Sequence, residues 1–259
     1  MATLWQNGIQ LPKPPARPSF LLQDSPRATS ELLNLWLQTQ PQVPSSGAAA
    51  AVRPDVRFGY TLQPLLQQAI YHWQQMQPAA EAADLMVVIL VCRQSNSYTS
   101  ASSNRLPPVD INIHISAAHR PYPHAAVSVA VVGPPRHLPE AKDSHWVQDR
   151  RPLEERLPVG AAEGLLATLD GKLLEGLVTN LFVVTGAADG SAVQVQTAAV
   201  QQGVLGGVMR RQVIEACHQL HLPVLEEAPA ISDRHLWQEA FVTNCVRQIQ
   251  PVSRITCDG

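Results

Sequence analysis

The stretch Leu-Leu-Glu-Gly-Leu-Val-Thr-Asn-Leu-Phe (173–182) places one carboxylate and one glycine between two apolar runs. This pattern predicts two strands joined by a tight turn that holds Glu175. A glutamate in such a turn is either exposed to water or faces inward, where it can pair with a cation. Thr179 and Asn180 would add polar groups to the same place.

Lys142 precedes Glu175 by 33 positions and follows Pro139-Glu-Ala, shortly after a predicted strand at 127–132. Taken alone it could be an ordinary surface lysine. A lysine that follows a strand end can also project into a cleft. Burial there would lower the pKa of the amine and make it nucleophilic.

A third segment, Gly-Val-Leu-Gly-Gly-Val-Met-Arg-Arg (203–211), opens a predicted helix at 208–220. The N–H groups of Val208 and Met209 would point outward at the helix start, where the helix dipole favours an anion. Gly207, like the glycine before it, would let a phosphate approach the backbone closely. The two arginines that follow are either surface residues or a source of positive potential.

An amine, a carboxylate and an anion site in this order indicate a pocket for pyridoxal phosphate. That cofactor needs a primary amine for its Schiff base, an anion beside its ring nitrogen and backbone donors for its phosphate.

The remaining pattern predicts a mixed α/β (α+β) fold with two domains. A helix is expected at 61–77 with Pro64 in its first turn, a buried strand at 85–92 and a half-buried strand at 109–115. Two prolines within three residues of Arg-Pro-Tyr-Pro-His (120–124) indicate a stiff linker. We therefore expect an N-terminal domain at 1–118 with a low-complexity stretch at 41–51, a linker at 119–124 and a strand-rich C-terminal domain at 125–259.

The composition argues against some classes of binding partner. Of the 259 residues, 15% are charged and the formal net charge is −2, which argues against nucleic acid, and no apolar run reaches membrane-spanning length. The four cysteines include no Cys-x-x-Cys pair, which favours a reducing compartment. We expect a cytoplasmic protein, or a plastid or other organellar one if the acid-poor N-terminus is a transit peptide. His218 and His221 are interpreted as a solvated helix face, and no metal is expected.

Taken in order, these segments resemble the class IV aminotransferase family, the pyridoxal phosphate enzymes of fold type IV. Residues 173–184 are similar to its Glu-Gly-x-x-(Ser/Thr)-Asn-x-Phe signature, and residues 203–214 to its Leu-x-Gly-Ile-Thr-Arg element. Segments 240–244 and 249–253 follow in family order, so the resemblance covers roughly residues 127–259.

The resemblance implies a role for each residue. Lys142 would carry the cofactor and move a proton, and Glu175 would bind the pyridine nitrogen. The phosphate would be bound at Val208, Met209 and Cys245, and Met209 replaces the threonine that is usual in the family. Polar or small residues beside these positions would complete the site: Gly207, Asn244, Thr179 and Asn180. The family also implies a homodimer that acts on a small amino acid and a keto acid.

The first half departs from the family pattern. The expected Gly-x-(Phe/Tyr)-x-(Thr/Ser)-x-Arg element is replaced near residues 25–30, and neither Arg27 nor Arg57 fits it. Three functions therefore remain open: an aminotransferase, a lyase similar to aminodeoxychorismate lyase that releases pyruvate, and a binding protein that has lost catalysis.

Overall fold

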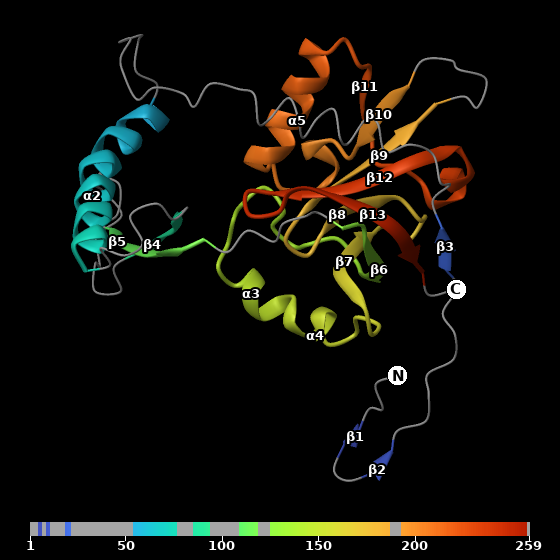
Figure 1. Cartoon of the computed structure of the whole chain (residues 1–259), viewed down its shortest axis with the longest axis horizontal. Coiled ribbons are helices and arrows are strands. Elements are labelled where there is room, and N and C mark those ends of the chain that lie inside the picture. The colour runs from blue at the N-terminus through green and yellow to red at the C-terminus, as the bar shows by residue number, and fades with distance from the viewer. Residues whose placement is uncertain are drawn as a thin grey trace, which may run out of the picture. The chain divides into compact units, whose positions relative to one another are not determined.

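A computed structural model describes residues 5–6, 9–10, 19–21, 54–76, 85–93, 109–118, 125–186 and 193–257 (Figure 1). Contacts divide the chain into two compact units, Met1–Pro41 with Pro121–Gly259, and Gln42–Arg120. The low-complexity stretch and the predicted linker lie outside the described residues, so the domain bounds stay a prediction.

The smaller unit contains helix α2 (Pro54–Met76) and the antiparallel strands β4 (Leu85–Arg93) and β5 (Val109–Ala117). The helix begins seven residues before the predicted start, and Pro64 lies inside it rather than in its first turn. Pro54 occupies the first position instead, where the missing N–H of proline costs nothing. The apolar periodicity, which starts at Leu62, did not reveal this extra N-terminal length.

The expectation of a buried strand at 85–92 was wrong. Residues 88–91 are exposed, and among the described strands β4 pairs with β5 alone. In β5 the predicted alternation is confirmed, since Asn112 and His114 are exposed while Ile111, Ile113 and Ile115 are partly buried.

The larger unit is built on a nine-stranded sheet. Its strands are β3 (Ser19–Leu21), β6 (Val127–Gly133), β7 (Ala161–Ala167), β8 (Leu173–Gly176), β9 (Asn180–Thr185), β10 (Gln194–Thr197), β11 (Val224–Glu226), β12 (Trp237–Asn244) and β13 (Gln248–Thr256). The order is β11-β10-β9-β12-β13-β6-β7-β8, and β3 pairs with β13. Strand β8 also pairs with β9, through Glu175 and Asn180, so the strands from β9 to β8 close into a ring.

Short helices connect these strands. They are α3 (Trp146–Asp149), α4 (Arg151–Glu154), η2 (Val200–Gln202), α5 (Val208–Gln219) and η3 (Ile231–Leu236). Two further strands near the N-terminus, β1 (Trp5–Gln6) and β2 (Ile9–Gln10), pair antiparallel.

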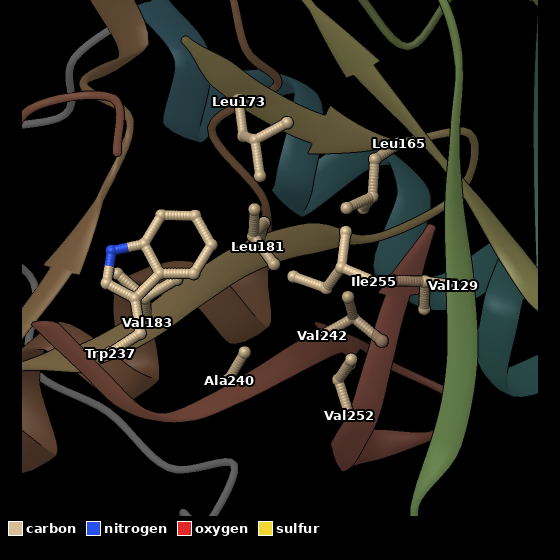
Figure 2. Close-up of a cluster of buried hydrophobic side chains, with 10 residues drawn as sticks. All are labelled: Val129, Leu165, Leu173, Leu181, Val183, Trp237, Ala240, Val242, Val252 and Ile255. Atoms are coloured by element: carbon tan, nitrogen blue, oxygen red, sulfur yellow. The ribbon is translucent and has the colours of Figure 1, made fainter. Parts of the chain in front are cut away.

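The ring of strands encloses an apolar core (Figure 2). Its members are Val129, Leu165, Leu173, Leu181, Val183, Trp237, Ala240, Val242, Val252 and Ile255. The opposite face of β9 and β12 packs on α5, where Phe182 and Phe241 stack with ring centroids 5.0 Å apart. Each buried aliphatic or phenylalanine side chain contributes about 1.5–3 kcal/mol, so burial on both faces fixes the register of β9 and with it the position of Asn180.

The mixed α/β fold with a strand-rich C-terminal half is confirmed. Within the described ranges, no helix is both long and apolar enough to cross a membrane, and no cluster of three metal-ligating side chains occurs.

Candidate active site

Glu175 is buried, with 4% of its side chain exposed. It lies near the end of β8 rather than in a turn, because it pairs with Asn180 across the ring closure. Oε2 accepts the backbone N–H of Leu205 at 2.9 Å, and Oε1 accepts Nε of Arg136 at 2.8 Å. Burial raises the pKa of the Glu175 carboxyl, and the Leu205 N–H, Arg136 and Lys142 oppose that shift.

Arg136 is a site residue that the sequence did not reveal. Its guanidinium donates to Glu175 and, through Nη2, to the carbonyl of Pro139 at 2.6 Å. It also lies over the ring of Trp146, 5.2 Å from the centroid. The available signal was a single arginine in the segment Pro-Pro-Arg-His-Leu-Pro, six residues before Lys142.

Lys142 lies in the loop between β6 and α3 and is exposed. The burial that we expected to activate its amine is therefore absent in this structure. Its positive charge nevertheless lies close enough to Glu175 to lower the pKa of that carboxyl. The structure thus brings the predicted amine and carboxylate into one neighbourhood.

Asn180, which pairs with Glu175, also contacts the residues at the start of α5. The Asn180 amide donates to the carbonyl of Leu205 at 2.9 Å, and a β-carbon on Gly207 would overlap Asn180 Oδ1. The first bond of the helix runs from Arg211 N to Gly207 O, so the N–H groups of residues 208–210 have no intrahelical acceptor. Met209 buries its side chain and Val208 is exposed, but both backbone donors sit at the helix start.

Three predicted site residues have other surroundings. Thr179 is buried beside the Glu163 carboxylate, whose pKa its hydroxyl lowers. Asn244 shapes a turn, since its Oδ1 accepts the N–H groups of Val246 and Arg247 while its amide donates to the carbonyl of Val178 at 3.2 Å. Cys245 is exposed in that turn.

These residues fit pyridoxal phosphate. The Glu175 oxygens each keep acceptor capacity beyond their single bond, and the close approach of Gly207 to Asn180 fixes a helix start that can bind an anion. Lys142 supplies an accessible primary amine. A guanidinium for the phosphate is not found among these contacts, because Arg210 turns to Ala198 and Glu226 instead.

Comparison with known proteins confirms the family that the sequence resembles. A family model described as amino-transferase class IV matches residues 62–255. An aminodeoxychorismate lyase of Bacillus subtilis (strain 168) is 27% identical over 124 residues, which are 46% of this chain and 40% of that protein. The chain thus aligns with less than half the length of this curated relative.

Solved structures share the fold. The fold IV-transaminase CpuTA1 from Curtobacterium pusillum matches with a TM-score of 0.57 at 16% identity, covering 76% of this chain and 63% of that one. The 4-amino-4-deoxychorismate lyase from Pseudomonas aeruginosa gives 0.51 at 21% identity, with 71% and 68% covered. The branched-chain amino acid aminotransferase from Thermobaculum terrenum in its PLP-form gives 0.52 at 16% identity, with 66% and 56% covered. At these identities the likeness establishes the fold alone.

Proposed function

Because the chain belongs to the class IV aminotransferase family of pyridoxal phosphate enzymes, we propose that it transfers an amino group between a small amino acid and a keto acid. The observation that supports this most is the bond from Leu205 N to Glu175 Oε2 at 2.9 Å. It ties a buried carboxylate to the loop that opens α5, so the two groups that would bind opposite ends of the cofactor keep a fixed spacing.

Each residue then has a defined task. When bound, pyridoxal phosphate supplies an electron sink for a substrate carbon that loses its proton. Glu175 would accept the pyridine N–H, and the N–H groups of Val208 and Met209 would donate to the phosphate. Lys142 would hold the cofactor through its amine and afterwards move the proton at the substrate α-carbon. Asn180 would hold the 205–207 loop in place.

A lyase that releases pyruvate is the second candidate. It is favoured by the alignment with the aminodeoxychorismate lyase of Bacillus subtilis. The two activities differ in their co-substrate, because a transaminase needs a keto acid acceptor and the lyase does not. Pyruvate released from 4-amino-4-deoxychorismate alone would establish the lyase. Amino transfer from an amino acid, seen only with an added keto acid, would establish the transaminase.

The first experiment uses an unusual property of the chain, which contains only three lysines: Lys13, Lys142 and Lys172. Purified protein is mixed with pyridoxal phosphate, reduced with borohydride, digested and analysed by mass spectrometry. We expect the cofactor on Lys142 and a visible absorption band that Lys142→Ala abolishes. Lys172→Ala is the matched control, because Lys172 pairs with Glu227 at 3.5 Å, outside the site. If wild-type protein takes up no cofactor, both enzymatic proposals fail and a non-catalytic binding role becomes the better account.

From the family resemblance we also propose a homodimer, and from the cysteine pattern a cytoplasmic location, with a plastid or other organelle as the alternative if the N-terminus is a transit peptide. Light scattering on the purified full chain tests the dimer. Imaging of the tagged full chain tests the compartment.

A further inference from the structure

The Arg136 side chain connects the Glu175 carboxylate with the loop that carries Lys142. Its side chain is 6% exposed, and its guanidinium makes three contacts, to Glu175 Oε1, to the Pro139 carbonyl and to the face of Trp146. Pro139 precedes Lys142 by three residues, and Trp146 follows it by four. One buried cation therefore contacts the carboxylate and both sides of the loop that presents the amine.

Trp146 is itself fixed from the other side. Its indole N–H donates to the carbonyl of Leu177 at 2.7 Å, and Leu177 lies two residues after Glu175. The loop with Lys142 is thus tied to the end of β8 twice, through Arg136 and through Trp146. The neighbouring acid, Asp143, bonds to the ring of His145 at 2.9 Å and does not take part in these contacts.

We propose that Arg136 is a positioning residue that holds the loop with Lys142 at a fixed place relative to Glu175. This proposal rests on the proposed use of both residues to bind pyridoxal phosphate. The planar guanidinium suits the task, because its several N–H groups donate in fixed directions to the carboxylate and the carbonyl while its face lies on the indole. A lysine at this position would keep the charge but lose the fixed fork.

The test compares full-length wild-type protein with Arg136→Met, Arg136→Lys and the control Arg151→Met. Arg151 lies in the next helix, α4. Its side chain is 80% exposed, and its ion pair with Glu155 is long at 3.9 Å, so its replacement should not affect the site. Pyridoxal phosphate affinity is measured by absorbance titration. We expect Arg136→Met to weaken binding about tenfold, equivalent to the loss of one charged hydrogen bond, and Arg136→Lys to fall between it and wild type.

A second readout needs no cofactor. Trace acetylation at pH 8 gives the rate at which Lys142 reacts relative to Lys172 in the same sample. Arg136 holds Pro139 and Trp146 on the two sides of Lys142, so its removal should change how the Lys142 amine is presented to the reagent. We expect Arg136→Met to change the rate at Lys142 about threefold and leave Lys172 unchanged, whereas an Arg136 that does not position this loop would leave the ratio unchanged in a folded variant.

The outcomes separate the two proposals. If wild type binds no pyridoxal phosphate, the proposed function fails, and the acetylation ratio still decides whether Arg136 acts on Lys142. If Arg136→Met does not fold, Arg136→Lys decides, and we expect its cofactor affinity to drop about threefold. Wild-type affinity and a wild-type acetylation ratio in the folded variants would overturn the role of Arg136.

Discussion

Asn180 and Gly207 approach so closely that a β-carbon on Gly207 would overlap Oδ1 of Asn180. The backbone angles of Gly207 (φ −61°, ψ 144°) are ordinary, so the requirement for glycine is steric and comes from this one neighbour. Asn180 cannot move away freely, because its amide donates to Leu205 and its backbone belongs to β9. The contact fixes the start of α5 against the ring of strands.

Gly207→Ala should therefore disturb the proposed phosphate site. We expect a loss of about 1–3 kcal/mol in the free energy of unfolding, together with weaker pyridoxal phosphate binding. Gly206→Ala is a matched control, since the nearest atom to its new β-carbon is Val200 Cγ2 at 3.6 Å, an ordinary contact. Urea unfolding and cofactor titration of both variants check this. Equal behaviour of the two alanines would contradict the steric account.

Glu163 should make stability depend on pH. It is 3% exposed, and its Oε1 accepts Gly164 N at 3.1 Å while Arg247 Nη1 lies 3.4 Å from Oε2. Burial raises the pKa of this carboxyl above its usual range, and Arg247 opposes the shift. A folded-state pKa above the unfolded one contributes stability below the unfolded pKa, and that contribution is lost as pH rises through the folded pKa.

Glu163→Gln should remove this contribution, because glutamine does not titrate. We expect the free energy of unfolding of the variant to fall less than that of wild type between pH 4 and pH 8. Urea unfolding at several pH values measures it. Glu155→Gln, at an exposed glutamate, is the control and should keep the wild-type pH dependence. If the free energy of unfolding of Glu163→Gln changes with pH in parallel with that of wild type, Glu163 does not cause the pH dependence.

Much of the larger unit follows from sequence pattern, for physical reasons. Helix α5 lies within one residue of its predicted range, 208–220, and β6 within one residue of the predicted strand at 127–132, because their apolar spacing matches the helical or strand period closely. Glu175, Asn180 and the glycines were found because they belong to one short motif, and the structure brings them together through Leu205.

The parts that pattern missed depend on contacts distant in sequence. Arg136 meets Glu175 across 39 positions, and no local period records such a pairing. The same holds for Thr179, which shares the motif with Glu175 but is buried beside Glu163. In the smaller unit, the apolar run of β4 predicted burial, yet burial depends on what covers a strand rather than on its own residues.

The cysteines should differ sharply in reactivity. Cys217 is fully buried on α5, and burial raises the pKa of its thiol to about 11, whereas Cys245 is exposed in the turn after β12. Because the thiolate is the reactive form, Cys217 should alkylate at least about a hundredfold more slowly than Cys245 in native protein at pH 8. Iodoacetamide labelling followed by mass spectrometry measures both rates. In urea the difference should vanish, which controls for the chemistry of the two peptides.

Arg210 should act in stability rather than as a phosphate cation. Although it lies in the first turn of α5, its side chain is 6% exposed and donates to the Ala198 carbonyl at 2.8 Å and to Glu226 at 2.7 Å. Arg210→Met leaves that buried carbonyl without this donor, so we expect a loss of about 1–3 kcal/mol in the free energy of unfolding. Arg211→Met changes an exposed neighbour and should stay within about 0.5 kcal/mol of wild type. Urea unfolding compares the two. If Arg210→Met keeps wild-type stability but weakens pyridoxal phosphate binding more than Arg211→Met does, then Arg210 serves the phosphate after all.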